Sequence, residues 1–316
     1  MTSNSPDLAV RIGSLRLKNP VMTASGTFGY GLEYAELFDI SKLGAVVIKA
    51  ATLEPRVGNP PPRVVETPAG MLNAIGLQNP GAEAVISEKL PRLAEYGVPI
   101  IVNLAGEAVD DYLQLAEKFS ACGQVSALEL NISCPNVKHG MDFGTHPQLT
   151  GELVSKVRAA SDLPLITKLS PNVTDITEIA VAAVEAGSDA LSVINTLVGM
   201  SIDIERRRPL LGNITGGLSG PAIKPVAVRC VWEVYEQVGV PIIGMGGIMN
   251  TQDALEFIMA GASAIAVGTA SFVNPTASLE IVAGLDAYMS SHNLADMAQL
   301  VGTAHSWYAG EPGPCR

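Results

Sequence analysis

The stretch EAGSDALSVIN, residues 185–195, combines the end of a helix, a glycine and a short apolar strand. The same order recurs as KLGAVVIK (42–49), EYGVPIIVN (95–103), QVGVPIIGM (237–245) and MAGASAIAVG (259–268). Glycine suits the left-handed position that closes a helix. The strands are apolar throughout, which is typical of parallel strands covered on both faces. The repeat therefore predicts alternating helices and parallel strands.

Eight such strands can be counted once the less regular members are included. VMTAS (21–25), ALELN (127–131) and PLITK (164–168) place them near residues 21, 45, 99, 127, 164, 190, 241 and 264. Eight units close an α/β TIM barrel, (β/α)8, whereas an open doubly wound sheet has the same local pattern. No low-complexity linker divides the chain, so we expect one domain over residues 1–316.

Three stretches fall outside the repeat. AVRIGSLRLKNP (9–20) predicts an N-terminal hairpin across the barrel floor. Residues 52–80 and 197–223 are insertions after strands 2 and 6, and a shorter one follows strand 4. Insertions after strands lie at the C-terminal mouth, where barrel enzymes build their active sites.

Composition excludes several classes of protein. Of 316 residues, 47% are hydrophobic and 16% charged, which is enough apolar material for a large core. The net charge of −11 opposes nucleic-acid binding. No apolar run is long enough to span a membrane, and the first residues lack a signal peptide, so we expect a cytoplasmic protein. The four cysteines form no metal-binding spacing, and no metal site is expected.

Glycines follow the last two strands, in GMGGI (244–248) and VGTA (267–270). Backbone N–H groups can approach a phosphate closely at such turns, although glycines also serve tight turns alone. The two motifs together predict a phosphorylated ligand. GTFGYG (26–31) has GxxGxG spacing and does not match the dinucleotide-binding motif.

Polar side chains end the remaining strands and converge on the same mouth. They are Lys49, Asn103, Asn131, Lys168, Asn195 and Thr196. Two ammonium groups and several carboxamides suggest a planar, anionic ligand or cofactor.

Cys134 follows strand 4 in NISCPN (131–136), where Pro135 stops the strand. A thiol with an ordinary pKa of about 8.5 can serve as a base near neutral pH. A free cysteine is more often a small buried apolar residue, and the motif alone leaves both interpretations open.

Six blocks together resemble the class 1B (NAD-linked) dihydroorotate dehydrogenase catalytic subunit. They are ASGTFGYG (24–31), GNPPPRVVETPAGMLNAIGLQNPG (58–81), NISCPNVKHG (131–140), GGLSGPAIKP (216–225), GMGGI and VGTA. The resemblance implies oxidation of (S)-dihydroorotate to orotate in pyrimidine biosynthesis. Cys134 would remove the C5 proton as a hydride passes from C6 to FMN.

The resemblance also implies the binding residues. The expected FMN contacts are Ser25, Lys49, Ala50, Asn103, Asn131, Lys168, Ile194, Gly220, Gly246, Gly247, Gly268 and Thr269. The expected substrate contacts are Lys49, Asn73, Ala74, Ile75, Gly76, Leu77, Asn131, Asn195 and Thr196.

The electron acceptor is inferred from the same resemblance. Gln78 favours the NAD-linked subclass, because the fumarate-linked class 1A usually has proline there. The quinone-linked branch uses serine as base and has an N-terminal extension, whereas here the first hairpin begins near Leu8. NAD linkage implies a partner subunit with FAD and a 2Fe-2S cluster, and a homodimer of this chain with two such partners, a heterotetramer.

The sequence departs from the family pattern in one loop, and two alternative functions are open. The loop at residues 141–145 is one residue shorter than the usual family loop. Another FMN barrel enzyme, such as a dihydropyrimidine dehydrogenase, would share the flavin site and a catalytic cysteine. A non-catalytic FMN-binding scaffold would keep the glycine motifs but would not need Cys134 with its asparagines.

Overall fold

Eight parallel strands form a ring at the centre of the computed structural model, which describes residues 6–133 and 143–308. Neighbours in the ring are consecutive along the chain, and a parallel bridge from Met22 to Ala45 joins the first strand to the second. The strands are β3 (Val21–Thr23), β4 (Val46–Val47), β7 (Ile100–Leu104), β8 (Val125–Asn131), β9 (Leu165–Leu169), β10 (Ala190–Val193), β15 (Ile242–Met245) and β16 (Ala264–Val267). The predicted (β/α)8 barrel is confirmed, and the open-sheet alternative is excluded.

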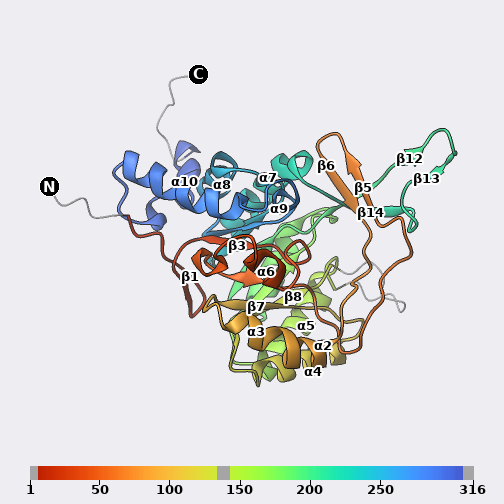
Figure 1. The fold of residues 1–316 in the computed structure, drawn as a ribbon. Coiled ribbons are helices and arrows are strands. Elements are labelled where there is room, and N and C mark those ends of the chain that lie inside the picture. Colours follow the sequence, from red (N-terminus) through yellow and green to blue (C-terminus); the bar gives the residue numbers. More distant parts are fainter. Residues whose placement is uncertain (1–5, 134–142, 309–316) are drawn as a thin grey trace.

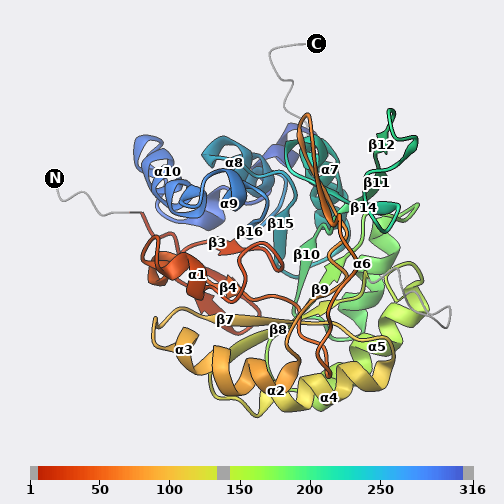
Figure 2. The same cartoon turned by 45° about the vertical axis from the view of Figure 1, so that its right-hand side comes forward.

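Helices cover the outside of the ring (Figures 1 and 2). They are α1 (Leu32–Ala35), α2 (Ala82–Ala84), α3 (Leu90–Ala94), α4 (Val109–Ser120), α5 (Pro147–Ala160), α6 (Ile176–Glu185), α7 (Lys224–Gln237), α8 (Thr251–Met259), α9 (Ala270–Val273) and α10 (Ala277–Ser291). The 3-10 helices are η1 (Ile40–Lys42), η3 (Pro221–Ile223), η4 (Met297–Gln299) and η5 (Thr303–Tyr308), and η2 (Val85–Lys89) is a π-helix.

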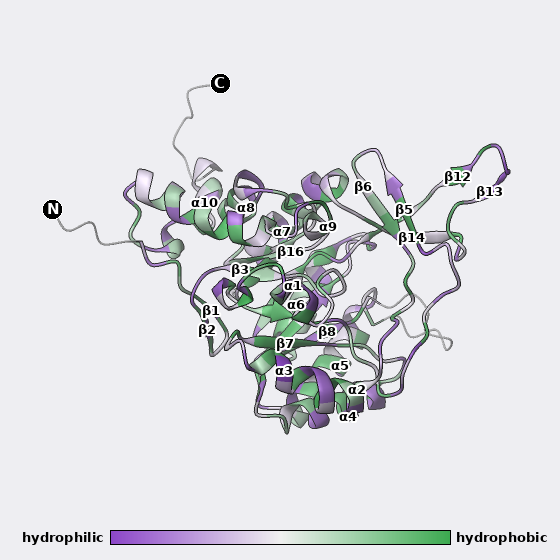
Figure 3. Cartoon of the chain, in the orientation of Figure 1, coloured by the Kyte–Doolittle hydropathy of each residue, from purple (hydrophilic) through white to green (hydrophobic). Residues whose placement is uncertain are grey.

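Amphipathic sequence explains why the helices pack against the ring. In α6, Ile176, Ile179, Ala180 and Ala183 recur at helical spacing and are buried, as their spacing predicts. The barrel strands are mostly hydrophobic, whereas hydrophilic residues lie on outer helix faces and on the β12–β13 arm described below (Figure 3). The apolar layer between strands and helices is therefore the main core.

Glycines end several of the helices as expected. Gly97, Gly187 and Gly261 adopt positive φ, whereas Gly44 and Gly239 are not among the positive-φ glycines. At Gly44 the reason for glycine is steric, because an added Cβ would collide with the carbonyl oxygen of Asn19. The left-handed prediction is thus wrong at two of the five turns.

The N-terminal hairpin closes one end of the barrel, as predicted. Strands β1 (Val10–Ile12) and β2 (Leu15–Leu17) pair antiparallel. Ile12 and Leu17 are fully buried and join the apolar cluster that fills the barrel interior. This plug leaves the C-terminal end of the strands as the open end.

The insertions after strands 2 and 6 combine into one antiparallel sheet above the barrel, a pairing that the sequence did not predict. Its order is β11-β14-β6-β5, formed by β5 (Val64–Thr67), β6 (Gly70–Asn73), β11 (Leu197–Met200) and β14 (Thr215–Ser219). The short β12 (Ile202–Asp203) and β13 (Arg208–Pro209) form an arm beside it (Figure 1). The insertion after strand 4 contains residues 134–142, which lie outside the described residues.

Candidate active site

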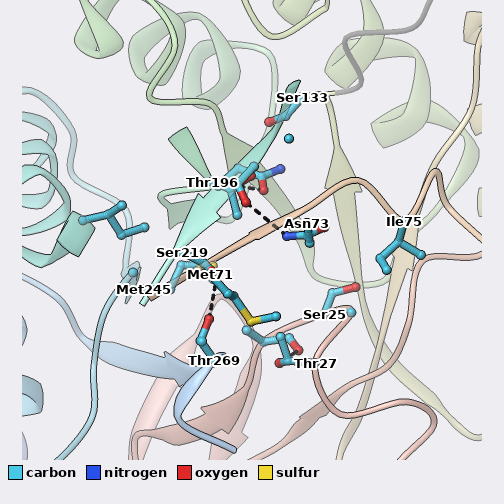
Figure 4. A pocket seen from close by; sticks show the side chains of 18 of the residues that line it. Ser25, Thr27, Met71, Asn73, Ile75, Ser133, Thr196, Ser219, Met245 and Thr269 are labelled. Carbon is cyan, nitrogen blue, oxygen red and sulfur yellow. Dashed lines mark hydrogen bonds between the residues drawn. The ribbon is translucent and has the colours of Figure 1, made fainter. Parts of the chain in front are cut away.

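A pocket of about 640 Å³ lies at the C-terminal mouth of the barrel, within the size range of small-molecule and cofactor sites. Its floor includes Met245 and Ala266 from the barrel interior, and Met71 and Thr215 of the inserted sheet also line it. Figure 4 shows side chains from these different elements pointing toward one space. The insertions therefore build a wall over the ring of strand ends.

The predicted cofactor residues come together in this pocket with one exception. Those that line it are Ser25, Lys49, Ala50, Asn131, Lys168, Ile194, Gly220, Gly246, Gly247, Gly268 and Thr269. Asn103 does not line it. Its side chain is fully buried below the pocket and donates to the Oε1 atom of Glu129 at 2.6 Å.

All of the predicted substrate residues line the same pocket. In addition to Lys49 and Asn131, they are Asn73, Ala74, Ile75, Gly76, Leu77, Asn195 and Thr196. The loop after β6 is held by Asn59, whose Nδ2 donates to the Ala74 carbonyl at 3.0 Å. Gly76 has φ +74°, and an added Cβ would lie 2.7 Å from the Asn59 backbone nitrogen. This loop therefore requires glycine for its close packing.

Gly220, Gly246, Gly247 and Gly268 line one side of the pocket and put no side chain of their own into it. At Gly247, where φ is +83°, an added Cβ would lie 2.7 Å from the Gly220 carbonyl oxygen. The Thr269 hydroxyl donates to Ser219 Oγ at 2.8 Å across the same region (Figure 4). Glycine backbone and hydroxyl groups that line a pocket suit a phosphate.

An ion-pair network supports the glycine turn from behind. Lys224 Nζ lies 2.7 Å from Asp253 Oδ1 and 2.8 Å from Glu256 Oε1. Asp253 Oδ2 accepts a hydrogen bond from the Met249 backbone at 2.9 Å. The hydrogen bonds to Asp253 and Glu256 raise the pKa of Lys224, so this side chain stays cationic and ties α7 to α8. The network explains how the turn keeps its shape.

Two lysines bring positive charge to the pocket. Burial lowers the pKa of Lys49 below its ordinary value of 10.5, and nearby Arg63 lowers it further while Glu33 acts in the opposite sense. Lys168 is 6% exposed, and it forms no ion pair with any described residue. Ammonium groups in such surroundings favour a bound anion as their partner.

Cys134, the predicted base, lies outside the described residues. Ser133 and Thr145, near the two ends of residues 134–142, both line the pocket. The Ser133 hydroxyl oxygen is buried, and among the described residues it has no hydrogen-bond partner (Figure 4). Described residues before and after this segment therefore border the pocket.

The pocket also contains polar residues that the sequence analysis missed. Asn172 Nδ2 donates to the Thr196 carbonyl at 3.0 Å, and its Oδ1 accepts from the Val198 backbone at 2.9 Å. It follows β9 in Ser170-Pro-Asn172, a polar turn at a strand end that could have identified it. Glu129, inside the barrel, was detectable as a charge in an otherwise apolar strand.

Neither a metal site nor a membrane-spanning helix is found among the described residues. Within residues 6–133 and 143–308, no group of three or more His, Cys, Asp or Glu side chains could hold a metal ion. Over the same residues, no helix has the length and apolar character needed to cross a membrane.

Comparison with known proteins agrees with the site. The dihydroorotate dehydrogenase family model matches residues 7–289. A protein of Desulforudis audaxviator is 60% identical over 298 residues, 94% of this chain and 97% of that protein. A Geotalea daltonii protein is 56% identical, with 94% and 98% covered. A Geobacillus sp. protein is 53% identical over 305 residues, with 96% and 97% covered. All three are named dihydroorotate dehydrogenase B (NAD(+)), catalytic subunit.

Proposed function

The chain belongs to the dihydroorotate dehydrogenase family, and we propose that it is the catalytic subunit of an NAD-linked enzyme that oxidises dihydroorotate to orotate in pyrimidine biosynthesis. The convergence of glycine turns, lysines and asparagines on one pocket is the observation that carries the proposal. A non-catalytic scaffold would need the glycine turns but not the asparagines and lysines beside them.

FMN is the cofactor that fits the pocket. Gly220, Gly247 and Gly268 line the pocket and put no side chain of their own into it, which suits a bound phosphate. Lys49, Lys168 and Asn131 line the same pocket and would contact the flavin ring of bound FMN. Bound FMN would supply the hydride acceptor, and a lysine at the ring would stabilise the charge of its reduced form.

Dihydroorotate suits the rest of the pocket because it is a cyclic anion with a carboxylate, carbonyls and ring N–H groups. Asn73, Asn131 and Asn195 offer both amide donors and acceptors for such edges. Lys49 supplies the charge opposite the carboxylate. These residues hold the substrate and determine which of its faces is reactive.

Cys134 is the base in this proposal. Its thiolate would remove the proton from C5, and the electron pair of that C–H bond would form the C5–C6 double bond, while bound FMN would supply the acceptor for the hydride from C6. A thiol with a pKa of about 8.5 is partly ionised near neutral pH and becomes more so as pH rises. Ser133, beside it in sequence, brings a hydroxyl to the same pocket.

Electrons leave through a second subunit. The described residues hold no metal-ligand cluster, and GTFGYG does not have the dinucleotide-binding spacing, so the 2Fe-2S cluster and FAD belong on the partner. We infer a single functional domain over residues 1–316 that pairs with a second copy and binds two partners as a heterotetramer. The same proposal places the enzyme in the cytoplasm.

Anaerobic titration of the purified chain tests the function. The protein should be yellow, and one equivalent of dihydroorotate should bleach its flavin absorption and yield one equivalent of orotate. The isolated chain should then be reoxidised slowly by NAD and by fumarate. A colourless chain that refuses FMN would refute the cofactor assignment, and rapid reoxidation by fumarate would favour class 1A.

Dihydropyrimidines without a carboxylate serve as the matched control substrate. The charge of Lys49 favours dihydroorotate over them, so they should reduce the flavin far more slowly. Equal rates would favour the dihydropyrimidine dehydrogenase alternative.

A further inference from the structure

A carboxylate lies inside the barrel directly below the pocket. Glu129 is 1% exposed, and it alternates along β8 with Ala127 and Asn131. Ala127 belongs to the apolar cluster of the barrel interior, so the side chain of Glu129 points to the same interior. One layer lower, Ile101, Ile166 and Ile243 fill the equivalent space with apolar groups. Packing alone therefore does not call for a carboxylate here.

Two donors from neighbouring strands satisfy this carboxylate. Asn103 Nδ2 lies 2.6 Å from Glu129 Oε1, and Ser192 Oγ lies 2.7 Å from Oε2. Asn103 and Ser192 are both fully buried. Because Asn103 donates its NH₂ group to Glu129, its Oδ1 atom is left to accept from the residue above it.

The side-chain amides of Asn131 and Asn195 extend this series of contacts toward the pocket. Asn131 Nδ2 lies 3.5 Å from Asn103 Oδ1, and Asn195 Nδ2 lies 3.5 Å from Asn131 Oδ1. These two contacts are long, as is common in sites without ligand. Asn195 is fixed independently, since its Oδ1 accepts from the Thr196 backbone at 2.8 Å. Both ends of the series therefore impose the same orientation on Asn131.

We propose that Glu129 is a positioning residue, which orients the pocket asparagines so that their N–H groups face the substrate. Each NH₂ group has two hydrogens, and only one is used within the series Glu129, Asn103, Asn131, Asn195. Asn131 and Asn195 both line the pocket, so their second hydrogens would be available to a ligand there. Carboxylate and carbonyl oxygens of dihydroorotate are the acceptors that they fit. This inference rests on the proposed function.

Glu129→Gln tests the proposal with almost no change of shape. Glutamine can offer its own NH₂ to Asn103, which removes the fixed direction of the series. We expect orotate, titrated against the flavin absorption of the FMN-loaded variant, to bind about tenfold more weakly, the effect of one hydrogen bond to a charged group. KM for dihydroorotate should rise by a similar factor, with a smaller change in kcat.

Ser192→Ala is the matched control, because it removes the other hydrogen bond to Glu129 and leaves the Asn103 contact intact. It should lower the melting temperature without changing orotate binding more than about twofold. If Glu129 had only a structural role, Glu129→Gln and Ser192→Ala would both lower the melting temperature and leave orotate binding within about twofold of the wild type. That result would overturn the proposal.

Neutron diffraction from the deuterated wild-type protein tests the orientations without any variant. Deuterium should lie on Nδ2 of Asn103, Asn131 and Asn195 in the directions given above, and a reversed amide at Asn103 or Asn131 would overturn the proposal. If wild-type protein failed to bind orotate at all, the proposed function would fail. Wild-type binding with an unaffected Glu129→Gln variant would instead refute only the positioning role.

Discussion

Gly247→Ala should damage the glycine side of the pocket. The residue has φ +83°, a conformation that costs a side chain about 1–3 kcal/mol. The new Cβ would also lie 2.7 Å from the Gly220 carbonyl oxygen and 2.9 Å from Lys224 Cβ. Because one of these atoms belongs to the backbone, the turn itself must move. We expect a loss of about 3 kcal/mol in the free energy of unfolding, which lowers the melting temperature by about 5 °C.

FMN binding should weaken with the same substitution, because the displaced turn no longer fits the phosphate. Calorimetry on the FMN-free protein gives the stability change, and fluorescence titration with FMN gives the Kd. Gly239→Ala is the control, since its φ is not positive and no atom lies within 4 Å of the added Cβ. If Gly247→Ala matched Gly239→Ala in both measurements, the steric reasoning would be refuted.

Two further predictions concern charge and packing. Lys49 binds an anion only while protonated, so orotate affinity should fall as pH rises through its lowered pKa, below the ordinary 10.5. Flavin titrations between pH 6 and 10 check this, and Lys49→Arg should flatten the profile; a constant Kd in the wild type would contradict it. Ile12→Ala, in the barrel floor, should cost about 3 kcal/mol in urea unfolding and leave the FMN Kd unchanged, because the pocket lies at the other end. Exposed Ile204→Ala should change the unfolding free energy by less than about 0.5 kcal/mol, and equal losses in both variants would count against a packed floor.

The barrel could be predicted because each of its units carries its own local signal. The apolar run of β10 after Gly187 shows both the strand and the helix end before it. Strand ends share one mouth in this fold, so the convergence of Lys49, Asn131 and Lys168 also followed from the sequence.

The sheet over the mouth could not be predicted in the same way. It pairs β6 with β14, segments far apart in the chain that the barrel brings together. β14 contains Gly216 and Gly217, and glycine is depleted in strands. An added Cβ at Gly216 would lie 2.7 Å from the Asn73 carbonyl oxygen, so glycine serves close packing that appears only in the folded chain. Asn103 was wrongly expected in the pocket for a similar reason. The sequence shows that it lies at the end of a strand, but it does not show the hydrogen bond to Glu129.

Stopped-flow reduction of bound flavin by dihydroorotate in Cys134→Ala tests the central claim most directly. Loss of a general base should slow reduction by about 10²- to 10⁴-fold while FMN content stays at the wild-type level. Cys122→Ala, which removes a thiol that does not line the pocket, should react at the wild-type rate. Reduction of Cys134→Ala as fast as that of Cys122→Ala would contradict the account.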